Sequence, residues 1–510
     1  MISRVTAPTL RRHKQVCAAA VVGATLAACG TTVPLTERVP SSNLSGGVET
    51  GGAGVRTPNA DSGPGSAPLG SGKGIDSGRG PAPLASGTAV DAAVGSAPLP
   101  SGAAGASGPL FPSVVKVGLQ YSDNGSTALA AAGSSNTAIP DTRPIDKAVI
   151  AYVNAQGGVA GRRLVPVFNK VDATASPVQQ SAQSCTQWTQ DDKVTVALPN
   201  SPFEDNANLR TCLGTAGVPA LYFNLYASTT VKGFAQQPLW AENISTSLES
   251  YAKTYVKGLK AQGFFEGGKV GVVYFDGPDF MATLNNTLLP ALRVAGVTPE
   301  TYGTHISGSS DLAAGSSGMQ SAVLNFRSKG VNRVLFFEPW VGYFAFMQAA
   351  QSQAYHPRYG LTSQESVQVA LDLGLVPRAQ LDGANLVSWL TIVDVPLARA
   401  VLGPRERLCR DIMRKGGVPL YSDQTSYAGQ MSICESILRL RDVYMDAPGR
   451  LVGSDFARGL EQLGTTAQYA TIARGSFSSS KHWGLSVYYD GKYDSGCGCF
   501  TVGAAPHAMS

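Results

Sequence analysis

Cysteines are the residues of this 510-residue chain whose number and spacing most suggest chemistry. Cys17 lies in an N-terminal apolar run, and Cys29 directly follows that run. Six cysteines then remain, and an even number in an oxidising compartment favours three disulfides over metal ligation. Spacing alone allows 15 pairings of six cysteines. The pairs that we predict are Cys185–Cys212, Cys409–Cys434 and Cys497–Cys499.

The grounds for these pairs differ. Each of the first two pairs would join consecutive predicted helices. Cys497 and Cys499 are left over, with one glycine between them. This spacing could also serve redox or metal chemistry, but in an exported chain we favour a structural disulfide.

The serine, glycine and histidine residues of this chain do not form the sequence motifs that are typical of enzymes. No Gly-x-Ser-x-Gly elbow precedes a predicted helix, and no Gly-rich phosphate loop is present. The segment Gly315-Ser316-Ser317-Gly318 follows no predicted strand. No histidine has a metal-ligand partner at a useful spacing; they are His13, His305, His356, His482 and His507. We therefore expect no enzyme, no metal and no cofactor.

The charge of the chain argues against nucleic acid as a partner. The formal net charge is +5, and part of it lies in the first fourteen residues. No dense stripe of Lys and Arg with interleaved aromatic residues occurs, which is the usual footprint of nucleic-acid binding.

The N-terminus has the pattern of an export signal. A basic start with Arg11, Arg12 and Lys14 precedes an apolar run from Val16 to Ala28, which is shorter than the roughly 20 residues of a membrane-spanning helix. The run ends in Leu-Ala-Ala-Cys29-Gly, which resembles a bacterial lipobox. We predict a signal peptide over 1–28 and a diacylglycerol anchor with further acylation, such as palmitate, on Cys29. An ordinary cleavage site with an incidental cysteine, or twin-arginine export, is the alternative.

Residues 29–112 have the composition of a disordered tether. Gly, Ser, Ala and Pro dominate, with too few large apolar residues to bury. A Gly-x-Ala-Pro-Leu unit starts at Gly65, Gly80 and Gly95. The repeat either lifts the domain from the membrane or is neutral slippage, and the sequence does not separate the two.

From residue 113 onward, short β-rich runs alternate with longer helical ones. We predict strands over 114–119, 164–171, 194–198, 219–223, 270–275 and 331–337, and helices over 144–155, 206–213, 248–259, 280–294 and 312–329, with a further helix opened by Ser176-Pro177. Strand, helix and strand in series mean parallel pairing. The segment is longer than one usual core. We therefore predict an α/β fold of two doubly wound parallel-sheet lobes, whose strand ends would bind ligands.

The segment Val153-Asn154-Ala-Gln-Gly157-Gly158-Val-Ala-Gly161-Arg-Arg-Leu164 carries a family resemblance. It resembles the helix-to-strand turn of the branched-chain amino-acid-binding protein family, the type I periplasmic solute-binding proteins of ABC transporters. Its glycines suit left-handed positions after a helix. Asp172, Pro177 and the order of the elements agree with that family.

The resemblance implies a venus-flytrap fold joined by a three-crossing hinge. It places a solute-binding domain at 113–503, with lobe 1 at 113–243 and 395–470, lobe 2 at 244–394 and 471–503, and a tail at 504–510. It also implies that the chain captures a small polar molecule, an amino acid or a related amide or acid, in the cleft between the lobes. An ABC permease would then read the closed form, in which the ligand contacts both lobes.

Candidate ligand contacts lie just past the strand ends. In lobe 1 they are Tyr121, Ser122, Asn200, Ser201, Asn224 and Tyr226, and in lobe 2 they are Tyr274, Phe280, Glu338, Trp340, Tyr343, Gln364 and Glu365. Where the family has a Ser-Ser/Thr run that holds a carboxylate, this chain has Pro199-Asn200-Ser201-Pro202. That turn is either an anion site made of backbone N–H groups and a hydroxyl or a plain helix cap. Glu365 aligns with the family's acidic residue that pairs with the ligand ammonium, or is a solvated loop residue. Trp340 would form an aromatic wall or only pack.

We expect a lipid-anchored monomer on the outer face of the cell membrane. A ligand sensor or cell-envelope scaffold with the same lobes is the alternative function, and a secreted hydrolase is a weaker one. A neighbouring operon of permeases and ATPases would favour uptake, and a nearby kinase would favour sensing.

Overall fold

The structure, a computed structural model, describes residues 113–131, 140–201, 206–223, 225–305, 312–339, 342–445, 451 and 453–510. All of them belong to one compact unit, Ser101–Ser510. The expected signal peptide, tether and lipid anchor at Cys29 lie outside the described residues, and they stay predictions.

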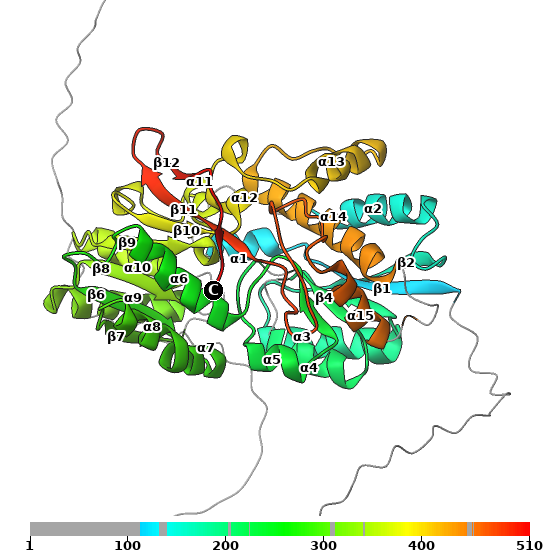
Figure 1. The fold of residues 1–510 in the computed structure, drawn as a ribbon, viewed down its shortest axis with the longest axis horizontal. Coiled ribbons are helices and arrows are strands. Elements are labelled where there is room, and N and C mark those ends of the chain that lie inside the picture. The colour runs from blue at the N-terminus through cyan, green and yellow to red at the C-terminus, as the bar shows by residue number, and fades with distance from the viewer. Residues whose placement is uncertain are drawn as a thin grey trace, which may run out of the picture. The chain divides into compact units, whose positions relative to one another are not determined.

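The first sheet has five strands in the order β2-β1-β3-β4-β5, all parallel (Figure 1). Its strands are β1 (Val114–Tyr121), β2 (Arg163–Lys170), β3 (Val196–Leu198), β4 (Ala220–Tyr222) and β5 (Trp240–Glu242). Between them run α1 (Gly125–Ala131), α2 (Arg143–Ala155), α3 (Pro177–Thr186), α4 (Asn206–Thr215) and α5 (Val231–Gln236). Parallel neighbours joined by helices are what the alternating sequence pattern predicts.

The second sheet follows the order β12-β11-β10-β9-β8-β6-β7, with β13 beside β11. Its strands are β6 (Val270–Phe275), β7 (Glu300–Thr304), β8 (Arg333–Phe337), β9 (Arg358–Thr362), β10 (Asn385–Ser388), β11 (Val487–Asp494), β12 (Cys499–Val502) and β13 (His507–Ala508). Strands β6 to β10 are parallel, whereas β11 runs antiparallel to β10 and to β12. The sheet is therefore largely, not wholly, parallel.

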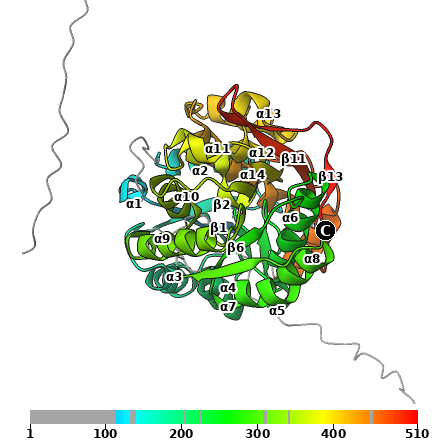
Figure 2. The same cartoon turned by 90° about the vertical axis from the view of Figure 1, so that its left-hand side faces the viewer.

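Helices cover both faces of the second sheet. Figure 2 shows α9 and α10 on one side of β6, and α6 and α8 on the other. The helices in this part are α6 (Leu248–Ala261), α7 (Pro278–Thr283), α8 (Leu289–Val294), α9 (Leu312–Ser328), α10 (Gly342–Ser352), α11 (Val367–Asp372) and α12 (Thr391–Asp394). The single helix expected over 280–294 is divided by a π-turn at Leu284–Leu288. Pro290 follows that turn and lacks the N–H that an unbroken α-helix needs there.

The chain passes between the two sheets three times. It leaves the first sheet after β5, leaves the second after β10, and returns to the second at β11. The chain between the second and the third passage contains α13 (Arg405–Lys415), α14 (Gln424–Tyr444) and α15 (Gly453–Leu463). Helices α13 and α14 pack against α2 of the first lobe. The three-crossing arrangement is thus present, while the residue boundaries of the lobes stay predictions.

A buried network on α14 ties two of these crossings together. Glu435 accepts hydrogen bonds from the side chain of Asn243 at 2.7 Å and from the N–H groups of Ala470 and Thr471 at 2.7 and 2.9 Å. Arg439 donates to the Asn243 side chain at 3.1 Å. Asn243 follows β5, and Ala470 lies between α15 and β11. One helix therefore holds the first and the third crossing.

The helix-to-strand turn that carries the family resemblance has the predicted conformation. Gly157, Gly158 and Gly161 have φ angles of +96°, +75° and +74°. A Cβ on Gly158 would lie 2.0 Å from the carbonyl oxygen of Arg162. The Asn154 side chain bonds both backbone groups of Leu164, at 2.7 and 3.0 Å. The motif thus clamps the end of α2 onto the start of β2.

Disulfides and the last residues complete the fold. The structure joins Cys185 to Cys212, Cys409 to Cys434, and Cys497 to Cys499.

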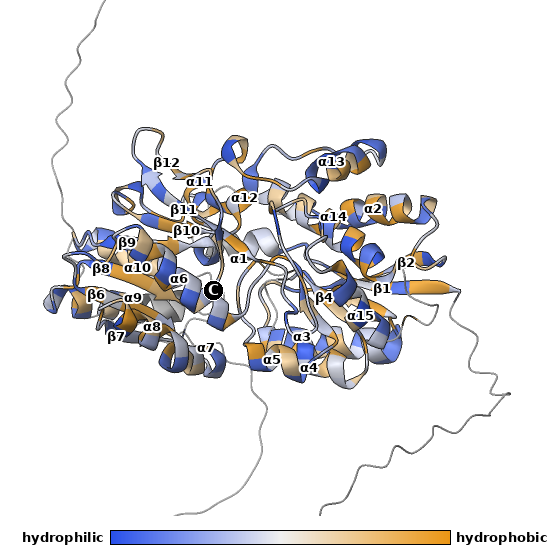
Figure 3. Cartoon of the chain, viewed as in Figure 1, coloured by the Kyte–Doolittle hydropathy of each residue, from blue (hydrophilic) through white to orange (hydrophobic). Residues whose placement is uncertain are grey.

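Apolar strands form the core, and β1 is hydrophobic along much of its length (Figure 3). Residues 504–510, expected to be a tail, contribute β13, and the backbone N–H of Ser510 donates to Thr254 of α6 at 3.0 Å.

Candidate functional site

The candidate site residues of the first lobe follow the carboxyl ends of β1, β3 and β4. Tyr121 ends β1 under the guanidinium of Arg143, whose carbon lies 4.1 Å from the ring centre. Ser122 donates to the side chain of Asn124 at 3.0 Å, and Asn124 donates to Asp172 at 2.6 Å. Hydrogen bonds from Thr174 and Asn124 lower the pKa of Asp172 to about 2. The ends of β1 and β2 therefore share one polar network around an ionised carboxylate.

Gln120 holds the turn after β3. The N–H groups of Asn200 and Ser201 both donate to the Gln120 side-chain oxygen, at 3.0 and 3.1 Å. These donors are therefore engaged within the protein. Of the two alternatives for this turn, these hydrogen bonds disfavour an anion site made of the Asn200 and Ser201 N–H groups.

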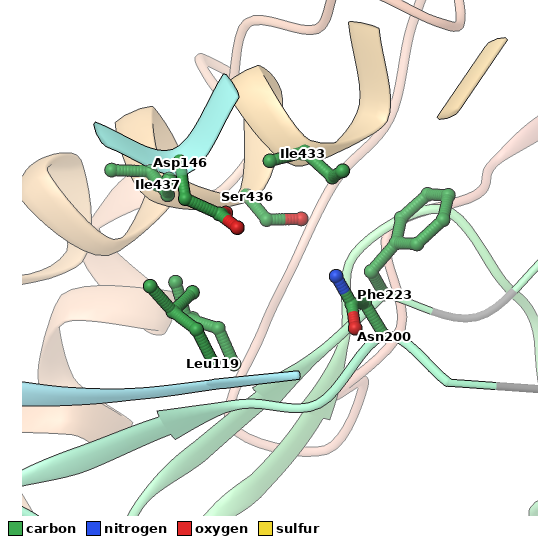
Figure 4. Close-up of a pocket in the computed structure, with 8 residues that line it drawn as sticks. Leu119, Asp146, Asn200, Phe223, Ile433, Ser436 and Ile437 are labelled. Atoms are coloured by element: carbon green, nitrogen blue, oxygen red, sulfur yellow. The ribbon is translucent and has the colours of Figure 1, made fainter. Parts of the chain in front are cut away.

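A small cavity lies behind the same strand ends (Figure 4). Its volume is about 10 Å³, which is about the smallest space that holds one water molecule. It is lined by Leu119, Asp146, Leu198, Asn200, Phe223, Ile433, Ser436 and Ile437. Apolar side chains from the strands and from α14 thus surround the side chains of Asp146, Ser436 and Asn200.

Asp146 of α2 is the unusual member of this cavity. It is 0% exposed, and neither carboxylate oxygen has a hydrogen-bond partner among the described residues. Burial raises the pKa of this carboxyl group well above its usual range, and Asp141 adds to the shift. Asp146 and Ser436 point into the same space in Figure 4. A neutral carboxylic acid is the form that this environment favours.

Glu365 of the second lobe follows β9 and is 1% exposed. Its carboxylate accepts from the N–H and the hydroxyl of Thr362, at 2.6 and 2.8 Å, as part of a capping box. Burial raises the pKa of Glu365 to about 8, against the lowering effect of those hydrogen bonds. Glu365 is therefore a buried turn residue, and the solvated-loop alternative is excluded.

Two more buried acids lie at neighbouring strand ends. Glu338 directly follows β8, and burial together with Glu365 raises the pKa of its carboxyl group. Asp394 of α12 accepts from Ser388 at 2.7 Å and from Ser363. Burial raises the pKa of Asp394 to about 7. Three carboxyl groups thus lie where β8, β9 and β10 end, each less acidic than in water.

The two lobes meet at Ala227 and Gln364. The Ala227 N–H donates to the Gln364 side-chain oxygen at 2.8 Å, and the Gln364 amide donates back to the Ala227 carbonyl at 3.1 Å. Tyr226, beside Ala227, is partly exposed. Burial raises the pKa of its phenol, and its hydroxyl bonds to Ser366. Tyr226 is therefore brought to the acidic strand ends of the second lobe.

The remaining candidates have mixed placements. Asn224 and Trp340 lie outside the described residues. Phe280 is buried against Phe275 and Phe337. Tyr343 is buried, and its hydroxyl donates to the Glu365 carbonyl. Tyr274 of β6 is partly exposed and its ring lies against Gly303 of β7, so a ligand role for Tyr274 stays a prediction.

Three polar residues near these strand ends were not among the predicted site residues. Gln120 follows the apolar run Val117-Gly118-Leu119 in the same strand, which was a usable signal of a buried hydrogen-bonding role. Asp146 shares a helix face with Ile150 and Val153 at four- and seven-residue spacing, so its burial was also detectable. Asp394 lies in an apolar run after β10, but its partners come from a different strand end.

The described residues hold neither a metal-binding cluster nor a membrane-spanning helix. Among the described residues, no group of three or more His, Cys, Asp or Glu side chains could hold a metal ion. In the same part of the chain, every helix is too short or too polar to cross a membrane.

A match to one protein-family model shows which family the chain belongs to. The family model described as "Periplasmic binding protein" matches residues 114–386, more than half of the chain. The chain belongs to this family. Periplasmic binding proteins bind solutes and are not enzymes, and the family includes relatives of the branched-chain amino-acid-binding type. No curated protein sequence matches the chain.

Solved structures of periplasmic binding proteins share the fold at low identity. A solute-binding protein from R. palustris in complex with 4-hydroxybenzoate has a TM-score of 0.55 at 12% identity, covering 78% of this chain and 97% of that one. A branched-chain amino-acid ABC transporter structure from Thermus thermophilus with bound valine has a TM-score of 0.53 at 16%, with the same coverages of 78% and 97%. A fatty acid ABC transporter substrate-binding protein from Thermomonospora curvata scores 0.52 at 16%, covering 78% and 92%.

Proposed function

We propose that this periplasmic binding protein captures a small molecule between its two lobes and delivers it to an ABC permease. The observation that carries the proposal is the junction where Tyr226 and Ala227 of the first lobe meet Gln364 and Glu365 of the second. A ligand placed there contacts both lobes only when they are closed, so its binding favours closure. The relatives with this fold are ABC transporter proteins.

The chemistry of the junction supports a ligand with an amino group. Three buried carboxyl groups lie at the second-lobe strand ends, and a ligand cation would favour the ionised form of any of them. On the first lobe, Gln120 already occupies the N–H donors of Asn200 and Ser201. We therefore propose amino acids or their amides as ligands, with the amino group held near Glu365 and the remainder near Tyr121, Ser122 and Tyr226.

The location of the protein is part of the proposal. A signal peptide over 1–28 and lipid on Cys29 would hold the chain at the outer face of the membrane, where a permease lies. Residues 29–112 would span the distance between the anchor and the lobes as a flexible coil.

A thermal-shift screen of the full exported chain tests the ligand class. The panel contains amino acids, amino-acid amides, aromatic acids and fatty acids, and hits are followed by calorimetry. A ligand at 100 times its Kd adds about 2.7 kcal/mol of apparent stability, so we expect a clear rise in Tm with an amino compound. Binding of aromatic or fatty acids without an amino group would contradict the ligand class. No stabilisation by any solute class would contradict the function.

Uptake separates transport from sensing. Cells lacking this protein should lose uptake of the radiolabelled ligand found in the screen, and the wild-type chain should restore it. Unchanged uptake in those cells, with the ligand still bound by the purified protein, would contradict delivery to a permease.

A further inference from the structure

The turn between β11 and β12 holds a disulfide that the binding function does not use. Cys497 lies on the exposed turn, and Cys499 is the first, buried residue of β12. The two half-cystines are separated by two positions, against 27 and 25 for the other two disulfides. Closing so short a loop constrains the unfolded chain least.

The hairpin does not depend on this disulfide for its register. Strands β11 and β12 pair from Gly491 opposite Val502 to Asp494 opposite Cys499. The carbonyl of Gly498, which has φ of +61°, accepts a hydrogen bond from Arg378. Backbone pairing and this arginine therefore already define the turn. The Cys497–Cys499 bond adds little to the structure, so a structural role does not explain why it is there.

The electrostatic surroundings favour thiolates. A guanidinium nitrogen of Arg399 lies 3.6 Å from the Cys497 sulfur and 3.5 Å from the Cys499 sulfur. A cation at that distance lowers the pKa of a thiol and stabilises the reduced pair. The other charged groups at the turn are Arg378, on the Gly498 carbonyl, and Asp494, whose carboxylate accepts from the Gly496 N–H at 2.9 Å. Arg399 is thus the charge in contact with both sulfurs.

We propose that Cys497 and Cys499 form a thiol–disulfide exchange site for an external dithiol. A thiolate of the dithiol attacks the sulfur of the exposed residue Cys497, the Cys497–Cys499 bond breaks, and its electron pair leaves on Cys499 beside Arg399. The second thiolate of the dithiol then attacks the dithiol's first sulfur, which is bonded to Cys497 in the mixed disulfide. This closes a disulfide within the dithiol and releases Cys497 as a thiolate. The dithiol is oxidised by two electrons and the protein pair gains them. The two protons lost by the dithiol are available to the two cysteines.

Equilibration with dithiothreitol tests the proposal on the full chain. The protein is held at a series of ratios of reduced to oxidised dithiothreitol, alkylated, and analysed by peptide mass spectrometry. Cys497–Cys499 should be half reduced at a ratio at least about 100-fold lower than either other pair, which lie between helices and are largely buried. Half-reduction of all three disulfides at one ratio would overturn the proposal.

Arginine variants identify the cause. Arg399→Ala should raise the ratio needed for half-reduction about tenfold, and Arg399→Lys should raise it less, because a cation remains near the sulfurs. Arg378→Ala is the matched control, since it removes a turn contact without removing the charge on the sulfurs, and its shift should stay within about twofold. An equal shift from Arg399→Ala and Arg378→Ala, or none from Arg399→Ala, would overturn the assignment.

A single-cysteine variant gives an independent readout. In Cys499→Ser the thiol of Cys497 remains, and the pH dependence of its alkylation rate reports its pKa. We expect a midpoint below the usual thiol value of about 8.5, and a return toward that value when Arg399→Ala is added. A midpoint at or above the usual value with Arg399 present would contradict the proposal.

Discussion

Asp146 illustrates how one side chain can oppose the stability of the fold around it. Its carboxylate has no hydrogen-bond partner among the described residues and is surrounded by α2, α14 and the first sheet. The unfolded chain offers the same group water. The folded state therefore binds its proton more tightly than the unfolded state does.

Replacing Asp146 by asparagine should stabilise the protein at neutral pH. Because the folded pKa is raised, the part of the destabilisation that comes from ionisation is absent below the unfolded pKa of about 3.8, and it grows as pH rises toward the folded pKa. We expect Asp146→Asn to gain about 1–3 kcal/mol in urea unfolding at pH 7 and to gain little at pH 3.5. The control is Asp411→Asn, because Asp411 lies on the surface, where it forms an ion pair with Arg414. A loss of stability at pH 7 would show that Asp146 has a partner that the fold conceals.

Glu365 should make ligand affinity depend on pH. With a pKa of about 8 in the unliganded protein, Glu365 is mostly protonated at pH 7 and must lose that proton to pair with a ligand ammonium. Affinity should therefore rise with pH, by about tenfold per unit up to pH 8, while the ligand stays protonated. Calorimetry in buffers of different ionisation enthalpy should detect one proton released per ligand at pH 6.5.

The matched variants are Glu365→Gln and Glu266→Gln, the latter on an exposed turn. Glu365→Gln should weaken binding by around 3–5 kcal/mol and remove the pH dependence below pH 8, whereas Glu266→Gln should leave both unchanged. Equal affinity for wild type and Glu365→Gln would remove Glu365 from the site.

At the scale of elements, α14 is the part that joins the crossings. Glu435 receives hydrogen bonds from the segment after β5 and from the segment before β11. Glu435→Ala leaves those donors without a buried acceptor and removes the carboxylate that lies near the buried Arg439, so we expect a loss of about 3–5 kcal/mol in urea unfolding. Glu461→Ala on the exposed face of α15 should change stability by less than about 0.5 kcal/mol. Similar losses in both variants would contradict a special role for the network.

The elements that the sequence predicted well are those defined by local signals. The glycines of the 157–161 turn adopt left-handed backbone, and strand 270–275 is a continuous apolar run. Both elements could therefore be predicted without knowing which other segments of the chain pack against them. Strand β11 was not, because its sequence Val-Tyr-Tyr-Asp-Gly-Lys-Tyr-Asp is largely polar and its partner β10 is distant in the chain. The same distinction holds for the site residues. Their positions just past the strand ends were predictable from the sequence. The hydrogen bond from Asn200 to Gln120 was not, because it depends on which strands are neighbours in the sheet.

At the scale of the whole molecule, Gln364 links the lobes directly. Gln364→Ala removes both hydrogen bonds to Ala227, which together contribute about 1–3 kcal/mol. Without ligand, the variant should populate an open form, seen as a larger radius of gyration in X-ray scattering. Saturating ligand should reverse the increase. Gln353→Ala, a position on the turn after α10, should scatter as wild type, and an unchanged radius in Gln364→Ala would show that other contacts set the closure.

The antiparallel return of β11 has a consequence for how the molecule is made. Asn385 of β10 pairs with Lys492 of β11, and α13, α14 and α15 all lie between them in the chain. During synthesis, the nascent second lobe therefore presents an unpaired β10 edge until almost the whole polypeptide has emerged. Pairings this distant form slowly, and open strand edges invite association with other chains. The lobe that carries Glu365 is thus completed last, and a chain truncated before β11 would be a substrate for chaperones and proteases instead of a binding protein.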